Sequence, residues 1–355
     1  MFEWPGQVKG DEMKPAQRES KRSPDNLPTS IDVARRAGVS QSAVSLVFGG
    51  KASGRIGRET QEAILRAAQE LGYRPHRAGQ TLRSGRTGIV ALVVPDVGNP
   101  IFAAVLQGVE RVARKAGYSV VLVTITNEQD WQQVISDALA SHAVDGFLLF
   151  TLRPPADELR AVLQGKAVIV DDYSIELPSL QLDIEGGARA AMSHLLQLGH
   201  TRIAHLAAAN ESETFRLRRA TYLHMLEAAG LPISTAYQVQ ADFTFGSAQM
   251  AAQRLLELHD PPSAIFCDSD FLAVGVYKAA ARLHRSIPRD LSVVGFDDSL
   301  LAHVLEPALT TVAIPTTLLG ECAIALLVAC LEQKPMRSTK AIPLAFIPRG
   351  STTTV

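Results

Sequence analysis

From Gly88 onward, short apolar segments of strand length alternate with longer segments of helical character. Strands that are apolar on both faces are expected in parallel sheets that helices cover on both sides. Because residues 88–355 are too many for one open sheet, two doubly wound lobes are predicted. The apolar segments are GIVALVVP, YSVVLVTI, GFLLF, KAVIVDD, RIAHLAAA, SAIFCD, LSVVGFDD and TTVAIP.

Polar residues follow several of these segments, and ligands of parallel sheets bind beyond the carboxyl ends of the strands. Carboxylates and amides at such an edge suit a polyhydroxylated ligand, but they would also suit acid–base catalysis or a divalent metal. The first strand-to-helix turn, PDVGNP, lacks the GxGxxG pattern of a dinucleotide site. We therefore expect neither enzymatic activity nor a cofactor. The polar residues are Asp96 and Asn99, Asp171 and Asp172, Asp268 and Asp270, and Asp297 and Asp298.

The charge of the chain is divided unevenly along its length. The formal net charge is only -1, which by itself argues against nucleic-acid binding. However, residues 29–87 carry ten basic and four acidic side chains, a net charge of +6, whereas residues 88–355 carry 20 basic and 27 acidic ones, a net charge of -7. A basic N-terminal module joined to an acidic body points to a polyanion at one end.

Residues 29–74 carry the signals of three short helices. Thr29 and Asp32 have the spacing of a capping box, and Ser40 is expected to cap the second helix. Two short helices joined by a tight turn of small residues are typical of a helix-turn-helix, although the pattern also fits other three-helix bundles. The helices are expected from Thr29 to Gly38, over 41–48 and over 58–71.

Three motifs in this part of the chain carry a resemblance. TSIDVARRAGVSQSAVS from Thr29, ELGYRP from Glu70 and LRSGRT from Leu82 closely resemble the lactose-repressor/galactose-repressor family of bacterial transcription regulators, and the resemblance runs to the C-terminus. It implies an all-α helix-turn-helix DNA-binding domain, a hinge helix, and an α/β core of periplasmic-binding-protein-like type that binds an effector and dimerises. The expected domains are a disordered tail at 1–28, the DNA-binding domain at 29–74, the hinge at 75–87 and the core at 88–355.

In that family the second helix of the head enters the major groove. Matched onto this chain, Gln41, Ser42 and Leu46 are expected to face base edges. Gln41 can bind adenine bidentately, Ser42 can bond to several bases, and Leu46 offers apolar contact, for example to a thymine methyl. Many relatives have a polar residue in place of Leu46, so their operators do not transfer to this chain. The residues expected to seat the helix are Ser40, Ala43 and Ser45.

The hinge of the family inserts a leucine into the minor groove at the centre of a palindromic operator. Leu82 matches this leucine, and an apolar wedge unstacks a base step and bends the duplex. Arg77, Arg83 and Arg86 are expected to contact phosphates. Gly79 stands where relatives commonly have Ala, which weakens a helix by roughly 1 kcal/mol. A plain linker role for Leu82 stays open.

The family binds its effector between the two lobes, and binding changes the angle between them. Arg218 is the matched residue best suited to an anionic or hydroxyl-rich ligand, while a role as cap, loop or core residue stays open for each position. The matched positions are Asp96, Asn99, Phe102, Thr214, Arg218, Phe243, Asp270 and Asp297. A sugar or related metabolite is the family's default effector, but this chain has fewer polar residues at the matched effector positions than its relatives have. The departures include Ile101, Ser212, Ser269 and Ile314.

The apolar runs and the cysteines indicate where the protein is located and which partners it has. No apolar run has the length of a signal peptide or a membrane span, so a cytoplasmic protein without membrane contact is expected. Cys267, Cys322 and Cys330 are expected to be reduced core residues, and no metal-ligand spacing is present. The sequence therefore predicts a homodimeric regulator, most often a repressor in this family, on a palindromic operator. The alternative is a solute-binding protein, which the basic head, the hinge and the missing signal peptide disfavour.

Overall fold

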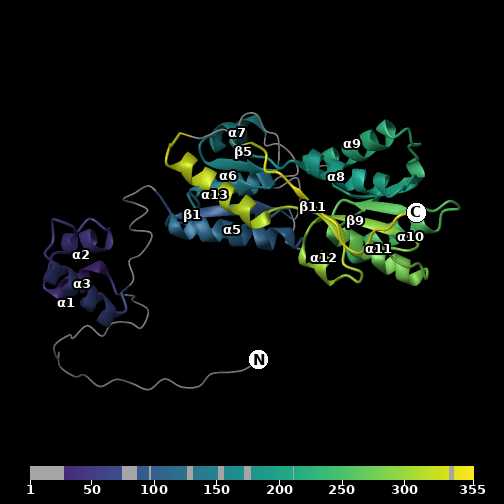
Figure 1. Cartoon of the computed structure of the whole chain (residues 1–355). Helices are drawn as coiled ribbons and strands as arrows, with labels where there is room; N and C mark the ends of the chain where they lie inside the picture. Colours follow the sequence, from purple (N-terminus) through teal and green to yellow (C-terminus); the bar gives the residue numbers. More distant parts are fainter. Residues whose placement is uncertain are drawn as a thin grey trace, which may run out of the picture. The chain divides into compact units, whose positions relative to one another are not determined.

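The structure, a computed structural model, describes residues 28–73, 86–95, 97–125, 131–150, 156–171, 177–210, 212–335 and 340–355. The chain divides into two compact units, Met1–Ser84 and Gly85–Val355 (Figure 1). Much of the predicted tail and hinge lies outside the described residues. So do four predicted site residues: Arg77, Leu82, Arg83 and Asp96.

The first unit contains the three helices that the sequence predicts. The capping box is confirmed: Asp32 N donates to Thr29 Oγ1 at 3.4 Å, and Thr29 N donates to Asp32 Oδ2 at 3.0 Å. Gly38 ends this helix with a φ of 66°, a conformation that glycine adopts without steric cost. Ser40 caps the second helix by accepting a bond from Ala43 N at 3.2 Å. The helices are α1 (Ser30–Ala37), α2 (Gln41–Phe48) and α3 (Arg58–Leu71).

A small apolar core fixes the orientation of these helices. Val33, Val44 and Ile64, one from each helix, are at most 1% exposed. Phe48 packs edge-on against Tyr73 with ring centroids 5.5 Å apart. Because Val44 faces this core, the N-terminal turn of α2 is turned toward solvent.

The second unit begins with a five-stranded parallel sheet of order β2-β1-β3-β4-β5. Helices α5 and α13 pack on one face and α6 and α7 on the other. Its strands are β1 (Ile89–Val94), β2 (Ser119–Thr124), β3 (Gly146–Leu149), β4 (Ala167–Val170) and β5 (Ser179–Leu180). Its helices are α5 (Ile101–Lys115), α6 (Trp131–Ala140), α7 (Asp157–Leu163) and α13 (Thr316–Leu331).

A second sheet repeats this strand order as β7-β6-β8-β9-β10 and adds the antiparallel edge strand β11. Helices α8 and α9 cover one face, α10 and α11 the other, so the prediction of two doubly wound lobes is confirmed. The strands are β6 (Ile203–Ala208), β7 (Gln238–Ala241), β8 (Ala264–Cys267), β9 (Ser292–Asp297), β10 (Thr310–Ala313) and β11 (Ala345–Ile347). The helices are α8 (Ile184–Gln197), α9 (Glu213–Ala228), α10 (Phe245–Leu256), α11 (Asp270–Arg282), α12 (Leu300–Val304) and the 3₁₀ turn Thr235–Tyr237.

Burial differs from the prediction at one strand. The sequence YSVVLVTI predicts a strand covered on both faces, but β2 lies at the edge of its sheet. Val121 is 39% exposed and Leu122 43% exposed as a result. The cysteines are closer to the prediction: Cys267 and Cys330 are buried, Cys322 is half-buried, and all three are free thiols.

The chain passes between the two sheets three times, after β5, after β10 and after α13. The first and third crossings lie side by side. Asp183 N donates to Ile342 O at 2.9 Å, and Ile342 N donates to Gln181 O at 2.8 Å. These three segments connect the lobes, and rotation of one lobe against the other would bend them.

Polar contacts hold the start of the second unit in place. The Asp145 carboxylate accepts bonds from Thr87 N at 2.7 Å and from Gly88 N at 2.8 Å. Arg86 Nη2 donates to Leu331 O, the last turn of α13, at 2.7 Å. The sequence predicts a phosphate contact for Arg86. In the structure this side chain binds instead to a carbonyl at the C-terminus of a helix, and the partial negative charge at a helix C-terminus favours a cation.

Candidate functional site

The first candidate surface is the N-terminal turn of α2. Ser40, Gln41 and Ser42 are exposed, whereas Ala43, Ser45 and Leu46 are half-buried. Gln41 Nε2 donates to Ser30 Oγ at 3.0 Å, and Ser40 Oγ lies 3.1 Å from Ser42 Oγ. These bonds join surface groups only, so a ligand with a better donor and acceptor pattern can replace them at small cost.

The same unit carries exposed basic side chains. Arg36 pairs with Glu70 at 2.7 Å and Arg58 with Glu62 at 3.3 Å. Lys51, Arg55 and Arg66 are exposed and form no ion pair with another described residue. Exposed cations without a counter-charge favour contact with a polyanion.

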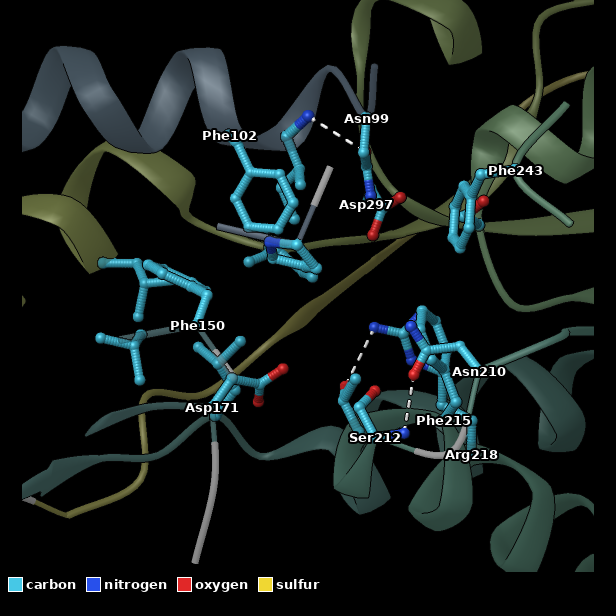
Figure 2. A pocket seen from close by; sticks show the side chains of 18 residues that line it. Asn99, Phe102, Phe150, Asp171, Asn210, Ser212, Phe215, Arg218, Phe243 and Asp297 are labelled. Atoms are coloured by element: carbon cyan, nitrogen blue, oxygen red, sulfur yellow. Dashed lines mark hydrogen bonds between the residues drawn. The ribbon is translucent and has the colours of Figure 1, made fainter. Parts of the chain in front are cut away.

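The second candidate is a cavity of about 120 Å³ in the second unit. Since roughly 10–15 Å³ holds one water molecule, this volume accommodates a small organic ligand. Residues from both lobes line it, and most of them follow the carboxyl ends of parallel strands, as the sequence predicts (Figure 2). The lining residues are Pro95, Asn99, Ile101, Phe102, Phe150, Val170, Asp171, Leu182, Asn210, Ser212, Thr214, Phe215, Arg218, Phe243, Ser269, Asp297, Ile314 and Leu319.

The first lobe contributes a mainly apolar wall. Phe102 and Phe150 pack edge-on with ring centroids 5.3 Å apart. Asn99 Oδ1 accepts a bond from Ile101 N at 3.2 Å, which fixes the turn at the start of α5. Phe102 therefore projects from the first turn of a helix whose end is held, and its position is defined before a ligand binds.

The second lobe contributes a buried cation. Arg218, on α9, is 3% exposed, and its guanidinium lies 3.7 Å from the ring centroid of Phe296 and 5.0 Å from that of Phe215. Its Nη1 donates to the Asp268 carbonyl and its Nη2 to Thr214 Oγ1, the latter at 3.3 Å. Its Nε is buried and has no hydrogen-bond partner among the described residues. A buried donor without an acceptor is costly, and here it belongs to a side chain that lines the cavity.

Asp297 lies at the end of β9 and faces the cavity (Figure 2). Its φ is 117° and that of Asp298 is 54°, which is the region that side chains rarely adopt. Burial raises the pKa of the Asp297 carboxyl well above its ordinary value of 3.8, Arg218 opposes this effect, and the carboxyls of Asp270, Asp268 and Asp171 add to it. The cavity thus holds a carboxyl with a strong tendency to carry a proton.

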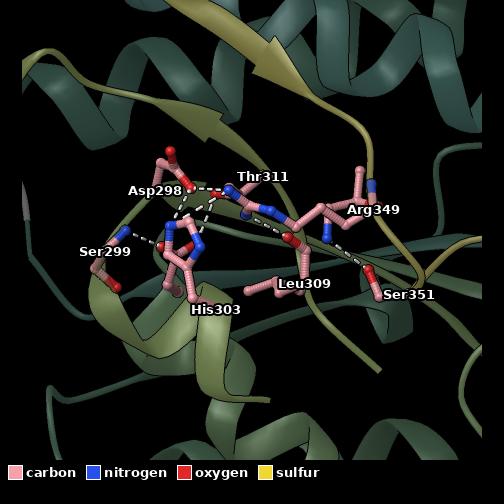
Figure 3. A network of polar contacts seen from close by, with 9 residues as sticks. Asp298, Ser299, His303, Leu309, Thr311, Arg349 and Ser351 are labelled. Carbon is pink, nitrogen blue, oxygen red and sulfur yellow. Dashed lines mark hydrogen bonds and ion pairs between the residues drawn. The ribbon is translucent and has the colours of Figure 1, made fainter. Parts of the chain in front are cut away.

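A polar network holds the strained turn that follows (Figure 3). Arg349 Nη2 donates to Asp298 Oδ1 at 2.5 Å, and its Nη1 donates to Leu309 O at 2.8 Å. His303 Nε2, on α12, lies 3.4 Å from the same Asp298 oxygen. These contacts fix Asp298, and through it the backbone that presents Asp297 to the cavity.

Asp270 lies apart from the other matched positions. It is matched to the effector site in the sequence, but it does not line the cavity and has no exposed surface. Its Oδ1 accepts a bond from Thr311 Oγ1 at 2.6 Å and its Oδ2 one from Ser299 N at 2.7 Å. Burial raises its pKa to about 6, while these two bonds oppose the shift. The side chain joins the segment after β8 to the turn after β9 and holds the fold.

Six of the eight positions matched to the effector site line the cavity: Asn99, Phe102, Thr214, Arg218, Phe243 and Asp297. The sequence does not single out Phe150, Asn210 or Phe215 as ligand contacts, and it names Ser212 only as a departure from the polar complement of the family. Phe150 directly follows β3, and Asn210 lies two residues after β6, so the strand-end rule could have found them. Phe215 lies beside Thr214 on α9 and carries no signal of its own.

His194 and His200 form hydrogen bonds within the fold. His194 Nε2 lies 2.9 Å from Thr352 Oγ1, and His200 contacts Ser263 and Ser292 at 2.9 and 3.0 Å. Across the described ranges, no group of three or more His, Cys, Asp or Glu side chains is arranged to hold a metal ion. Within the same ranges, no helix is both long and apolar enough to cross a membrane.

Comparison with known proteins gives the following matches. Residues 31–76 match the model "Bacterial regulatory proteins, lacI family", and residues 192–352 match "Periplasmic binding protein-like domain". The chain is 30% identical over 333 residues to the HTH-type transcriptional repressor CytR of Escherichia coli, and 34% identical over 328 residues to the ribose operon repressor of Halalkalibacterium halodurans. Each alignment covers 92% of this chain and 97% of the relative.

Solved structures give the same architecture. The complex of the transcriptional regulator CelR with cellobiose matches with a TM-score of 0.67 and 29% identity, covering 91% of this chain and 99% of that one. The lac repressor dimer bound to operator and the anti-inducer ONPF matches with a TM-score of 0.81 and 24% identity, covering 92% and 100%. The second match supports the fold alone.

Proposed function

Because the chain belongs to the lacI family of bacterial regulatory proteins, it is a DNA-binding transcription regulator, and we propose that a small molecule in the cavity controls its operator affinity. The observation that carries this conclusion is the extent of the similarity. Two transcriptional repressors align with head and core together, over 92% of the chain. A solute-binding protein would require the core alone.

The exposed turn of α2 supports base recognition by Gln41 and Ser42. In the major groove, Gln41 would exchange its bond to Ser30 for a bidentate contact with adenine, and Ser42 would bond to a neighbouring base. Leu46 would add apolar contact with a thymine methyl. Ser40, Ala43 and Ser45 would seat the helix against the backbone.

The hinge assignments follow from the family pattern. Leu82 would insert into the minor groove between two half-sites, and Arg77 and Arg83 would neutralise phosphates beside it. A wedge at the centre of the site requires two copies of the hinge. This requirement agrees with a homodimer on a palindromic operator, because two-fold protein symmetry matches two-fold DNA symmetry.

An exposed apolar surface supports self-association. Leu300 is 75% exposed and Val304 is 66% exposed, and their spacing of four residues places them on one face of α12. Exposed apolar side chains that lie next to one another are typical of protein contact surfaces. We assign this face to the contact between two copies of the core.

The cavity supports an uncharged or weakly anionic ligand that carries hydroxyl groups. Phe102 and Phe243 offer apolar faces for a ring. The Arg218 guanidinium offers a donor, the Asp297 carboxyl can donate or accept, and Asn99 and Thr214 complete the polar set. A sugar or related metabolite fits this chemistry. Because the ligand contacts both lobes, binding would change their mutual angle at the three crossings.

One experiment tests the function. DNA from the region upstream of the gene should be retarded in a gel by the purified protein, and the affinity should fall by a factor of about 10³ or more between 50 and 200 mM salt. Sugars and related metabolites are screened for compounds that raise the melting temperature of the protein, and the retarded DNA is then titrated with those compounds. Absence of binding, or binding that salt leaves unchanged, would overturn the DNA-binding function.

A matched pair of variants tests the cavity. Arg218→Ala should lose the response to the active compound and keep operator binding. Arg219→Ala changes the adjacent arginine, which is exposed and donates to Gln238 Oε1 at 3.2 Å, and it should respond as the wild type does. A normal response in Arg218→Ala would show that the effector binds elsewhere. Chemical conversion of the compound during the assay would favour the enzyme alternative instead.

A further inference from the structure

The starting observation concerns the partners of Arg218. This guanidinium is almost fully buried, yet it forms no ion pair with any carboxylate that the structure describes. Asp268 is in direct contact with it, but through the backbone: Arg218 Nη1 donates to the Asp268 carbonyl oxygen. A buried guanidinium beside a buried carboxylate normally pairs with it. Something must therefore hold the Asp268 side chain elsewhere.

Two donors hold that side chain. Asp268 has no exposed surface. Its Oδ2 accepts a bond from Ala208 N at 2.9 Å, and its Oδ1 lies 2.8 Å from His205 Nε2. With one oxygen bound to the backbone of β6 and the other to an imidazole, the carboxylate is satisfied on the side of the strands.

His205 is itself fixed in place. It is 1% exposed, and its ring is stacked on that of Phe266 with centroids 5.4 Å apart and lies 5.0 Å from the ring of Tyr222. Tyr222 lies one helical turn beyond Arg218 on α9, and its hydroxyl donates to Ile203 O at 2.9 Å. The imidazole therefore cannot leave its position without disturbing the helix that carries Arg218.

We propose that His205 is a positioning residue of the effector site: it binds the Asp268 carboxylate on the side of the strands and so leaves the Arg218 guanidinium available to a ligand. The inference rests on the proposed function, because it concerns the same cavity. If the guanidinium were paired with a carboxylate inside the protein, its N–H groups would already be bonded and its positive charge would be neutralised. In the observed arrangement the charge and the N–H groups remain available to an acceptor atom of the effector.

The test uses nuclear magnetic resonance of the full-length protein with ¹⁵N-labelled arginine. The Nε–H signal of Arg218 is identified by its loss in Arg218→Lys. In His205→Leu the donor to Asp268 is removed, so the carboxylate should turn to Arg218 and the signal should shift downfield. His205→Gln keeps an amide donor and should leave the signal at its wild-type position. Melting curves identify any variant that does not fold.

A double variant separates positioning from packing. The substitution Asp268→Asn keeps an amide oxygen that can accept the bond from Ala208 N, but it removes the charge that could pair with Arg218. Adding it to the His205→Leu protein should therefore return the signal toward its wild-type position. If the signal of His205→Leu stays in place, or if the double variant matches His205→Leu, the proposal is wrong. These spectra are recorded without DNA or effector, so their outcome is independent of the operator experiment.

Discussion

At the scale of single residues, Asp297 combines two costs that the fold does not need. Its backbone lies in a rarely adopted conformation, and its carboxyl is buried beside other carboxyls. Strained backbone conformations and carboxyls with shifted pKa values are found most often at functional sites. The Arg349 network around Asp298 keeps the turn in place (Figure 3).

The raised pKa of Asp297 predicts a dependence of stability on pH. The folded state binds this proton more tightly than the unfolded state does, so this carboxyl lowers stability as the pH rises from 3.8 through the folded pKa. Asp297→Asn removes the charge and keeps the shape. Its free energy of unfolding in urea should exceed that of the wild type at pH 7, and the two should converge near pH 4.

Asp290 provides a comparison, because its pKa is shifted in the opposite direction to that of Asp297. A hydrogen bond from Arg289 lowers its pKa to about 2, so its contribution is present above pH 3.8 and is lost as the pH falls through the folded pKa. Asp290→Asn should therefore be the less stable protein at pH 7. A difference between Asp297→Asn and the wild type that does not vary with pH would contradict the assignment.

At the scale of elements, the pair α5 and α13 connects the cavity with the start of the core. Both helices begin near the cavity, where Phe102 and Leu319 line it, and the far end of α13 bonds to Arg86. Two glycines allow their close approach. A Cβ on Gly108 would lie 2.1 Å from Thr317 O, and one on Gly320 would lie 2.2 Å from Val105 O. We therefore expect α5 and α13 to move as one rigid pair.

Gly320→Ala tests this close packing. The added methyl must push the two helix backbones apart, which should lower the free energy of unfolding by about 1–3 kcal/mol and weaken the effector response, because Leu319 shifts with it. Gly246→Ala on α10 is the control, since its Cβ would have no atom within 4 Å. Urea unfolding of both proteins is the measurement, and equal stability would show that the helices separate freely.

At the scale of the whole molecule, the charge differs between the part that binds DNA and the part that binds the effector. The net charge of -1 is the sum of +6 on residues 29–87 and -7 on residues 88–355, since the charges of residues 1–28 cancel. The exposed Lys51, Arg55 and Arg66 belong to the first group. An acidic core is repelled by phosphate, so only the head and hinge should contact the operator.

Leu82→Ala tests the hinge at this scale. If Leu82 unstacks a base step, the variant should bind the operator more weakly and bend it less, while the melting shift caused by the effector stays the same. Gel retardation with circularly permuted DNA measures affinity and bending together. Unchanged bending would leave Leu82 as an ordinary linker residue.

Periodicity and capping signals were sufficient for most of the fold. Thr29, Gly38 and Ser40 act on their own neighbours in the chain, so their helix boundaries could be predicted from local spacing. The long apolar strands were equally clear. The sequence does not predict the short edge strands β5, β7 and β11, because two to four residues are too few to give a periodic signal.

The sequence alone determined the class of the molecule, since a capped helix-turn-helix, a charge boundary and alternating apolar segments are local properties of the chain. The tertiary structure decided how individual polar groups are used. Asp270 and Asp268 follow the same strand, yet one bonds to Thr311 and the other to His205, and neither lines the cavity. Such partners come from distant segments, and their positions depend on how sheets and helices pack.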